Sequence, residues 1–340
     1  MADGPVSKVT LRDIAERVGV SVSAVSMALH DHPRIGEETK RRVQQAADDL
    51  TYVTNAAGRA LRANRAGAIA LIVPNTSSHV LSHAYFMHVL TGVNDVASAH
   101  ESQLILSTNT DEANGEVAYD RVLRSGSVDG AIVTSAAAAD PGIEHLVASR
   151  LPVVLLGRYP HLPAAVSVSI DDVEASRRAT EHLAVVHHRR DLVHVAGPLL
   201  HQSAIDRRDG FVAACTALGI EPRVVVGDYS EESGVAAVAR LGADPVDGVV
   251  AANDEMAFGV LRGLRATGLD VPSDVALIGY DDFGLSRVTT PAISTVHVPA
   301  VDMARTAAEQ LFALLDGRTT QSGVVGAPGV HLELRASCGC

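Results

Sequence analysis

The sequence has 340 residues, of which 47% are hydrophobic, so it has enough apolar side chains for two or three buried cores. Its formal net charge of −12 excludes a protein that is basic throughout, but the charge is uneven. Residues 1–65 carry a net charge of +2, and residues 66–340 carry a net charge of −14. A weakly basic head on an acidic body fits a small nucleic-acid-binding module joined to a domain with another task.

The composition also excludes several classes of protein. Charged residues interrupt the first twelve positions, so we expect no secretory signal, and no apolar run is long enough to span a membrane. We therefore expect a cytoplasmic protein. Cys215 lies on a predicted helix as a buried small hydrophobe, whereas Cys338 and Cys340 are expected in an exposed tail. Two cysteines alone are too few for a typical cysteine-based metal site, and the sequence has no second pair. We therefore expect no metal site and no cofactor.

Residues 9–29 predict two short helices separated at Gly19, where a positive φ suits glycine. Thr10 is placed to cap the first helix with Asp13 as its capping-box partner, and Ser21 is placed to cap the second. Helical spacing gathers one apolar face from Ile14, Ala15, Val18, Val20, Val25 and Leu29. The outer face of the second helix carries Val22, Ser23, Ala24, Ser26 and Met27. This pattern is typical of a DNA-reading helix-turn-helix, although any small pair of helices would fit this stretch alone.

A third helix is predicted from Glu37 to about Leu50, with Val43, Ala46 and Ala47 on its apolar face. The three helices would form a module of about 50 residues with a modest core. The third helix carries three basic side chains, Lys40, Arg41 and Arg42. They could contact DNA phosphates, or equally well form a face of the helix that is exposed to solvent. The basic, alanine-rich residues 55–65 then predict either an inert linker or a helix that forms only on a partner.

From Gly67 onward, short apolar runs alternate with helical patterns, which predicts doubly wound α/β sheets. The strands are expected at 68–74, 103–107, 130–134, 152–156, 192–196, 223–226, 248–252, 275–279 and 330–334. The helices are expected at 86–99, 116–125, 141–149, 173–186, 204–218, 233–241, 255–267 and 301–315. These are too many strands for one small sheet, so we expect two similar lobes that divide near residues 167–171.

Ligands bind at the carboxyl ends of the strands in such sheets, so polar residues at those ends are candidate ligand contacts. They are Asn75, Asn109, Asp111, Arg158, Asn253, Asp254, Asp281 and Asp282. Any one of them also fits a helix cap, and for Asn75 and Asp254 that alternative is about equally good. An arginine at such a position is suited to vicinal hydroxyls, a carboxylate or a phosphate.

Taken together, these features resemble the lactose-repressor/galactose-repressor family of transcription factors along nearly the whole chain. The resemblance is carried by the opening helix-turn-helix and by Tyr52, Asn55, Arg59-Ala60-Leu61-Arg62, Val128-Asp129-Gly130, residues 151–158, Arg207, Gly210-Phe211, residues 252–257 and Gly279-Tyr280-Asp281-Asp282. It implies an N-terminal all-α headpiece and a two-lobed α/β body like a type I periplasmic binding protein. The implied domains are 1–54 for DNA binding, 55–66 as a hinge, and 67–337 for ligand binding and dimerisation. Lobe 1 would hold about 67–168 and 299–325, and lobe 2 about 169–298 and 326–337.

The resemblance also implies roles for single residues. Val22, Ser23 and Met27 occupy positions that face bases in the major groove, and Leu61 matches a hinge leucine that enters the minor groove. Phosphate contacts are implied for Thr10, Ser21, Ser26 and His30, and the hinge would add Asn55 and Arg59. Effector contacts are implied for Arg207 and Asp281 and less firmly for Arg158 and Asn253, to which the strand-end pattern adds Asn75 and Asn109.

Three departures from the family pattern affect these expectations. Met27 lacks the hydrogen-bonding groups that bidentate reading of guanine needs. Residues 75–86 are predicted to form a longer loop than usual, in which His79 and His83 are loop histidines rather than metal ligands. Asp172 replaces a commoner asparagine.

The sequence stops soon after Ser337, which leaves no room for a tetramer-forming helix and favours a dimer.

We therefore expect a DNA-binding regulator, most simply a repressor, which binds a pseudo-palindromic operator as a homodimer. A small-molecule effector, best a saccharide, would bind between the lobes. The alternative is a sugar-binding receptor without a role on DNA. An enzyme is not expected, because the sequence has no nucleophile elbow, no phosphate-binding glycine-rich loop and no metal-ligand motif, so no catalytic residue is assigned.

Overall fold

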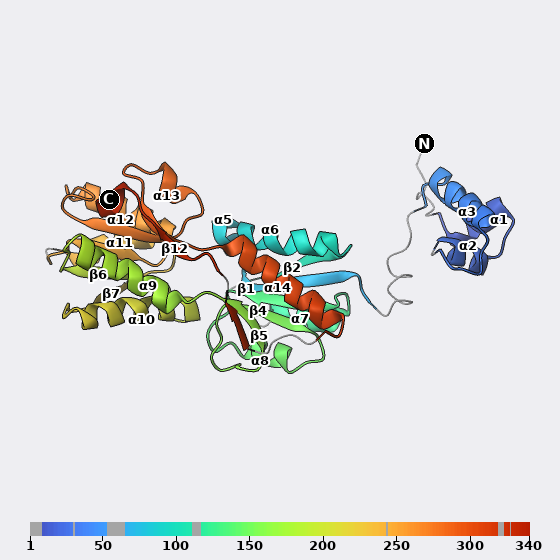
Figure 1. The fold of residues 1–340 in the computed structure, drawn as a ribbon, viewed down its shortest axis with the longest axis horizontal. Helices are drawn as coiled ribbons and strands as arrows, with labels where there is room; N and C mark the ends of the chain where they lie inside the picture. The colour runs from blue at the N-terminus through green and yellow to red at the C-terminus, as the bar shows by residue number, and fades with distance from the viewer. Residues whose placement is uncertain are drawn as a thin grey trace. The chain divides into compact units, whose positions relative to one another are not determined.

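The computed structural model describes residues 9–29, 31–52, 65–110, 117–242, 244–318, 323–326 and 328–340. The chain divides into two compact units, residues 1–66 and residues 67–340. The first unit is a small group of helices, and the second contains two β-sheets with helices on their faces (Figure 1). Among the described residues, no helix combines the length and apolar character that crossing a bilayer requires.

The headpiece consists of α1 (Leu11–Val18), α2 (Val22–Leu29) and α3 (Glu37–Asp49). The predicted caps are confirmed. The Thr10 backbone N–H donates to the Asp13 carboxylate at 2.7 Å, and the Ser21 hydroxyl accepts from the Ala24 N–H at 3.2 Å. Gly19 has a φ of 76°, so the turn between α1 and α2 needs a residue without a side chain.

The predicted apolar faces of these helices meet in one core. Its buried members are Ile14, Ala15, Val18, Val25, Ala28, Val43, Ala46 and Ala47, and Val20, Leu29 and Leu50 pack against them. Every apolar residue predicted to face inward therefore does so. The core is small, which makes the headpiece sensitive to the loss of a single buried side chain.

Lobe 1 of the second unit is built on a parallel sheet of order β11-β5-β4-β3-β1-β2. Its strands are β1 (Ala68–Thr76), β2 (Gln103–Asn109), β3 (Gly130–Thr134), β4 (Val153–Leu156), β5 (Val166–Ser169) and β11 (Gly323–Gly326). Its helices are α5 (Ser77–Ser82), α6 (Ala84–Ala99), α7 (Val117–Ser125), α8 (Pro141–Val147) and α14 (Ala300–Leu315). α6 and α14 cover one face of the sheet, and α7 and α8 cover the other (Figure 1).

Lobe 2 is built on a second sheet, of order β12-β10-β9-β8-β6-β7, in which β12 alone runs antiparallel. Its strands are β6 (Leu192–Ala196), β7 (Arg223–Val226), β8 (Gly248–Ala251), β9 (Ala276–Asp281), β10 (Ser294–His297) and β12 (His331–Glu333). Its helices are α9 (Asp172–Glu181), α10 (Gln202–Ala217), α11 (Glu231–Leu241), α12 (Asp254–Ala266) and α13 (Leu285–Val288). A π-helical turn η1 (His182–Val186) continues α9, and a short 3₁₀ turn η2 (Ala336–Cys338) follows β12.

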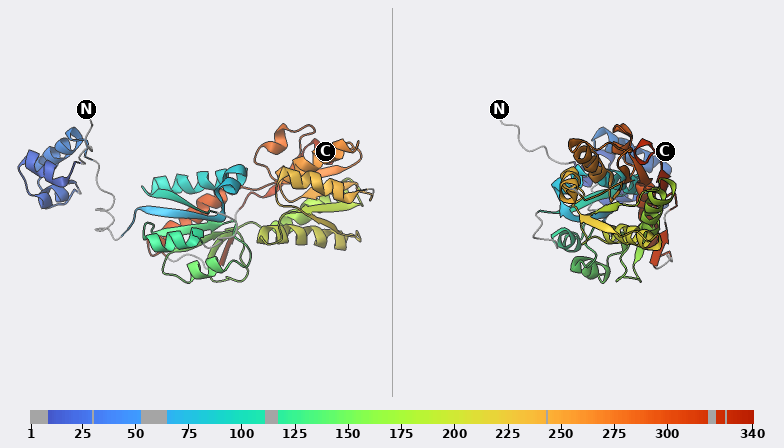
Figure 2. Two further views of the ribbon diagram at one scale, coloured as in Figure 1. Left: turned by 180° about the vertical axis from the view of Figure 1, so that it is seen from behind. Right: turned by 90° about the vertical axis from the view of Figure 1, so that its left-hand side faces the viewer.

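The chain passes between the lobes after β5, after β10 and after β11, so each lobe is assembled from segments far apart in the sequence (Figure 2). The predicted doubly wound α/β architecture is confirmed. The short strands β5, β10 and β11 were not predicted, because runs of four residues that include serine, threonine or glycine carry little periodicity.

Two predictions about single segments are wrong. Residues 77–82 form helix α5, and His83 precedes α6, so residues 75–86 are not the expected extended loop. The side chain of His79 lies outside the described part of the chain, as does Asp111. Cys338 is buried rather than exposed, whereas Cys340 is exposed and Cys215 is buried as expected.

Candidate effector pocket and DNA-binding surface

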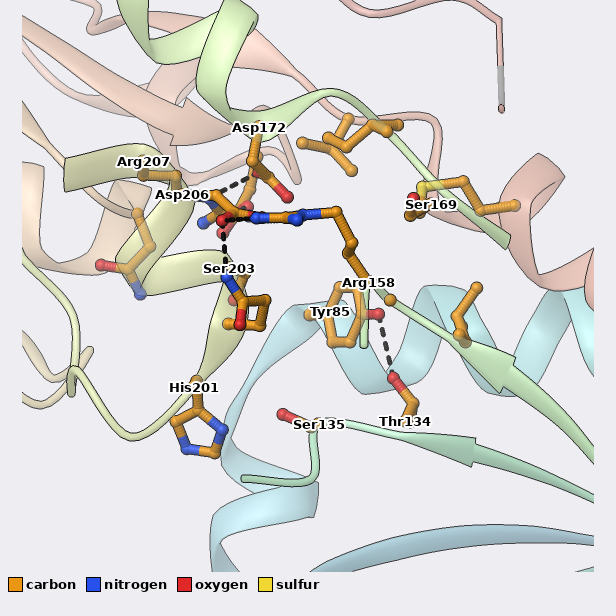
Figure 3. Close-up of a pocket in the computed structure, with 18 of the residues that line it drawn as sticks. Tyr85, Thr134, Ser135, Arg158, Ser169, Asp172, His201, Ser203, Asp206 and Arg207 are labelled. Carbon is orange, nitrogen blue, oxygen red and sulfur yellow. Dashed lines mark hydrogen bonds and ion pairs between the residues drawn. The ribbon is translucent and has the colours of Figure 1, made fainter. Parts of the chain in front are cut away.

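A pocket lies between the two lobes, at the carboxyl ends of strands from both sheets (Figure 3). Lobe 1 contributes His83 and Tyr85 from the start of α6 and Arg158 from the turn after β4. Lobe 2 contributes Asp172 at the start of α9 and Arg207 from α10. Side chains from both lobes surround the pocket, which suits a small molecule.

Arg207 connects several buried groups on the lobe 2 side of this pocket. Its Nε donates to Asp172 Oδ1 at 2.8 Å, and its Nη1 donates to the carbonyl of Ala252 at 2.6 Å. Asp281 Oδ1 lies 3.7 Å from the same Nη1. The guanidinium carbon also sits 3.8 Å from the ring centroid of Tyr280, within the range of a cation–π contact. These contacts fix the guanidinium at the pocket wall.

The packing of α9 against α10 brings Arg207 and Asp172 together. Gly210 lies one turn after Arg207, and a Cβ atom there would come within 2.1 Å of the Val173 carbonyl. The absence of that atom allows the two helices to approach closely. The Tyr280 hydroxyl donates to Asp172 Oδ1 at 2.7 Å, so this carboxylate is held from both sides.

Arg158 and Asp206 form an ion pair that joins the two lobes across the pocket (Figure 3). Arg158 Nε donates to Asp206 Oδ2 at 2.7 Å, and its Nη2 donates to Oδ1. Gln202 also donates to Asp206 Oδ1 at 2.7 Å. The bidentate geometry is the stronger form of this interaction, and Asp206 is buried while Arg158 is partly exposed. Any ligand that uses Arg158 must share it with Asp206.

The lobe 1 wall of the pocket contains three large aromatic side chains. The hydroxyls of Tyr85 and Thr134 lie 3.1 Å apart, and burial raises the pKa of Tyr85 to about 12. Tyr159 and Phe86 line the same side, and Tyr229 lines the lobe 2 side. Aromatic rings beside charged hydrogen-bonding groups suit a ligand with both apolar faces and polar edges.

The lining of the pocket is more acidic than basic. It contains the carboxylates of Asp172, Asp206, Glu255 and Asp281 against the guanidinium groups of Arg158 and Arg207. Both arginines are already paired with carboxylates of this chain. Burial raises the pKa of Asp281 well above its usual range and also raises that of Glu255. The two arginines are thus balanced by Asp172 and Asp206, so a neutral polar ligand fits this lining better than a phosphate or a carboxylate, which would add a negative charge without a free cation among the described lining residues to pair with it.

Four of the six residues expected to contact an effector line the pocket: Arg158, Arg207, Asn253 and Asp281. Asn75 and Asn109 do not, and the expectation for them is corrected. The Asn75 amide donates to the Ser135 carbonyl at 3.2 Å, and Asn109 Oδ1 accepts from the Ala118 N–H at 3.0 Å. The two side chains hold lobe 1 together at the ends of its strands.

Asn253 lines the pocket, but its side chain is also occupied by the backbone. Its Oδ1 caps α12 by accepting from the Met256 N–H at 2.9 Å, and its Nδ2 donates to the Tyr229 carbonyl at 2.9 Å. Asp254 and Asp282 do not line the pocket. Asp254 accepts from the Asp282 N–H at 2.9 Å, so these two strand-end carboxylates hold lobe 2 together.

Several pocket residues were not assigned from the sequence, among them His83, Tyr85, Gln202, Asp206 and Tyr229. Asp206 directly precedes Arg207 on a predicted helix, so their adjacency was the available signal. Gln202 lies one turn before Asp206 on the same helix, so the same helix was the available signal for it as well. Tyr85 lies within residues 75–86, for which the sequence predicts a loop.

On the headpiece, the residues predicted to contact DNA fall into two groups. Thr10, Ser21, Val22 and Ser23 are exposed, and Met27 is partly exposed. Ser26 is only 5% exposed, so the expectation that it lies on the outer face of α2 is wrong. His30, Asn55, Arg59 and Leu61 lie outside the described residues.

The three basic side chains of α3 are used within the headpiece. Lys40 pairs with Asp31 and with Glu37, the latter at 2.8 Å. Arg41 pairs with Glu38, and Arg42 donates to the Val18 carbonyl at 2.7 Å. These contacts favour a structural role over phosphate contact.

Known proteins share both parts of this architecture. Residues 10–55 match the family model described as bacterial regulatory proteins, lacI family, and residues 180–338 match the periplasmic binding protein-like domain. The HTH-type transcriptional regulator CelR of Thermobifida fusca is 32% identical over 92% of this chain and 93% of the relative. The probable HTH-type transcriptional repressor ExuR of Bacillus subtilis (strain 168) is 31% identical over 92% of this chain and 94% of the relative.

Solved structures of transcriptional regulators are also similar to this chain over nearly its whole length. A complex of the transcriptional regulator CelR with cellobiose covers 97% of this chain and 100% of its own, with a TM-score of 0.74 and 29% identity. A lac repressor dimer bound to operator and the anti-inducer ONPF has a TM-score of 0.87 at 24% identity and covers 98% of this chain and 99% of its own, a likeness in fold.

The fold and the interlobe pocket define a two-domain regulator with a helix-turn-helix headpiece and a periplasmic-binding-protein-like body. The chain belongs to the lacI family of bacterial transcriptional regulators, which bind DNA and are not enzymes. The predicted family and fold class are confirmed, and the assignment favours the regulator over the alternative of a sugar receptor without a role on DNA.

Proposed function

We propose that this regulator is a repressor that binds a pseudo-palindromic operator as a homodimer and is controlled by a neutral saccharide bound between its lobes. The observation that carries the proposal is the pocket itself. It combines aromatic walls with two arginines that are already neutralised by carboxylates of the chain. Sugar hydroxyls donate to carboxylates and accept from guanidinium groups, so a neutral polyol satisfies this lining without a new charge. One relative, CelR, has been solved as a complex with cellobiose.

Within this proposal, Arg207 and Asp281 contact the effector from lobe 2 and Arg158 contacts it from lobe 1. Asn253 acts mainly by holding the start of α12 at the pocket edge. Effector binding changes how the lobes close and therefore how residues 55–66 present the headpieces to DNA. Such coupling between two sites is typically about 1–3 kcal/mol, or about 5- to 150-fold in operator affinity.

On DNA, we propose that Val22, Ser23 and Met27 face the bases, that Thr10 and Ser21 contact phosphates, and that Leu61 enters the minor groove at the operator centre. Because Val22 and Met27 offer no strong hydrogen bonds to base edges, specificity depends on the Leu61 wedge and on DNA deformability. Leu61→Ala is expected to weaken operator binding while leaving non-specific binding nearly unchanged. Equal loss of both in a titration would contradict the wedge.

A thermal-shift screen of the full chain tests the effector class, with neutral mono- and disaccharides, sugar phosphates and uronates as probes. Neutral saccharides are expected to raise the melting temperature, whereas the anionic sugars are not. Each active compound is then titrated into the protein–operator complex at fixed salt, because affinity for DNA depends steeply on salt. A sugar phosphate as the best stabiliser would overturn the neutral class. A stabilising saccharide that leaves operator affinity unchanged would overturn the proposed control.

A further inference from the structure

Four side chains with metal-binding atoms meet at one place in lobe 2: His182, His187, Cys338 and Cys340. One ligand atom from each lies within 4.8 Å of all the others. Cys338 is buried, the two histidines are partly buried, and Cys340 is exposed. None of the four lines the pocket between the lobes. The chain end marked C in Figure 1 belongs to this lobe.

Three distances within this cluster are close to the edges of a tetrahedral zinc site. The two histidine Nε2 atoms are 3.1 Å apart, and Cys340 Sγ lies 3.4 Å from that of His182 and 3.3 Å from that of His187. With ordinary Zn–N and Zn–S bond lengths, a tetrahedron has edges of about 3.3 Å between nitrogens and about 3.6 Å between nitrogen and sulfur. Small shifts of these side chains leave room for one ion between them, with Cys338 Sγ within 4.8 Å of the other three ligand atoms.

The π-helical turn η1 explains how two histidines five residues apart come together. In an α-helix, residues five apart point about 140° away from each other around the axis. The wider π turn, with its i→i+5 hydrogen bonds, instead brings the fifth residue round above the first. His182 begins this turn and His187 follows it, so the irregularity converts a divergent pair into a convergent one. Such turns occur often at functional sites.

The opposite side of the cluster is held by hydrogen bonds to the sheet. The Ser337 hydroxyl donates to the Leu277 carbonyl at 2.6 Å and accepts from the Ser294 N–H at 2.8 Å. Gly339 has a φ of 103°, which turns the backbone so that Cys340 reaches the histidines. A Cβ on Gly339 would lie 3.2 Å from His187 Nδ1, so a small residue is also needed for space.

We propose that His182, His187, Cys338 and Cys340 bind one Zn²⁺ ion as a closed, structural Cys₂His₂ site. Two thiolates and two imidazoles in tetrahedral arrangement are the donor set that zinc prefers, and four protein ligands leave no open position for catalysis. The ion joins residues 335–340 to the helix that begins with Asp172. Since Leu277 lies near the start of β9, the site is at the sheet edge opposite the effector pocket.

Metal analysis of the untagged full chain, purified with a phosphine reductant and dialysed against zinc-free buffer, tests the proposal. We expect about one zinc per chain by mass spectrometry, and the absorption of a tetrahedral thiolate complex when Co²⁺ replaces zinc. Cys340→Ser is the main variant, because Cys340 is exposed and its loss disturbs no packing. Its zinc content is expected to fall to about a tenth or less.

His188→Asn is the matched control, since His188 adjoins His187 but is not one of the four ligands and has a φ of 54° that asparagine tolerates. This variant should keep its zinc. A chelator should lower the melting temperature of the parent and of His188→Asn by several degrees and leave Cys340→Ser unchanged. Equal zinc in the parent and Cys340→Ser would overturn the proposal, as would no zinc in the parent. A Cys338–Cys340 disulfide in the reduced preparation would also overturn it. None of these outcomes bears on the saccharide pocket.

Discussion

Arg207 is the residue on which the lobe 2 side of the pocket depends. Its charge is buried between Asp172 and Asp281 and lies over the Tyr280 ring. Burying charges is costly unless they are paired, and removing one partner leaves the others without compensation. The same side chain thus has a structural role and, in the proposed function, a ligand-binding role.

Replacing Arg207 with alanine is expected to lower the free energy of unfolding by about 3–5 kcal/mol, because two carboxylates remain buried without their partner. Urea denaturation followed by circular dichroism measures this. Arg208→Ala is the matched control: Arg208 is the next residue and pairs only with its neighbour Asp209 among the contacts identified. Its effect should be small. A similar loss of unfolding free energy in both variants would show that the buried ion pairs of Arg207 do not stabilise the fold more than an exposed pair does.

Asp282 connects several basic groups in lobe 2 and predicts a pH dependence. It accepts from Arg287 Nη2 at 2.9 Å and from Arg335 Nη2 at 2.6 Å. Burial opposes ionisation, but these hydrogen bonds prevail and lower the pKa of Asp282 below its ordinary value of 3.8. The folded protein therefore binds this proton less readily than the unfolded chain. The stabilisation is fully present above the unfolded pKa and is lost as the pH falls through the folded pKa.

Asp282→Asn, which cannot ionise, should lower the melting temperature by several degrees near neutral pH. The difference from the parent should shrink only below about pH 4, where Asp282 takes up a proton in the unfolded parent chain but not yet in the folded one. Thermal unfolding from about pH 7 to about pH 3 gives the two curves. A difference that stays constant across this range would rule out ionisation of Asp282 as its source.

At the scale of elements, close packing of helices positions the pocket residues of the body, and a small core determines the stability of the headpiece. Gly210 allows α10 to lie directly on α9, which aligns Arg207 with Asp172. In the headpiece, three short helices share one small cluster in which Val25 is completely buried. Such a module has little stability in reserve, so its fold depends on each large side chain in the cluster.

Substitutions at two valines of α2 distinguish a loss of headpiece folding from a loss of DNA contact. Val25→Ala should unfold or strongly destabilise the headpiece and abolish operator binding, because burying fewer methyl groups costs about 1 kcal/mol or more each in a small core. Val22→Ala removes the same groups from a side chain that is 45% exposed, so the headpiece should stay folded. Calorimetry and operator titration distinguish the variants. The body should keep its own melting transition in both, and loss of it in Val25→Ala would contradict the independence of the two units.

At the scale of the whole molecule, the Arg158–Asp206 pair joins the two lobes directly. It forms only when the lobes are close enough to bring β4 of lobe 1 near α10 of lobe 2. The pair therefore favours the arrangement of the lobes seen in the structure, and a ligand that competes for Arg158 changes this balance. A ligand can shift the equilibrium only by its difference in affinity for the two arrangements.

Asp206→Asn should loosen this arrangement, so small-angle scattering of the unliganded protein should give a larger radius of gyration than for the parent. The effect of the saccharide on operator affinity should change as well, because the two sites are linked through closure. Asp209→Asn, one turn further along α10, removes an exposed carboxylate and serves as the control. If both variants kept the parental radius of gyration and coupling, the interlobe pair would not contribute to this arrangement of the lobes.

The sequence alone determined the local features of this protein. Helical spacing identified the inward faces of α1–α3, residue chemistry identified the caps at Thr10 and Ser21, and alternation predicted the doubly wound body. These succeed because each depends on side chains within a few residues of one another. Arg158, Asn253 and Asp281 line the pocket as the strand-end pattern predicts, because strand ends in such sheets meet at one edge, whereas Arg207 in α10 was expected only from the family resemblance.

Only the tertiary structure decided which polar groups meet. Arg158 and Asp206 are 48 residues apart, and Cys340 lies more than 150 residues from the two histidines it approaches. Asn75 and Asn109 have the same position in the pattern as Asn253, and backbone groups take up the amides of all three, yet only Asn253 lines the pocket. Local periodicity fixes which face of an element is buried. Which partner satisfies a buried or converging polar group depends on how distant elements pack, and on irregularities such as the π turn after α9.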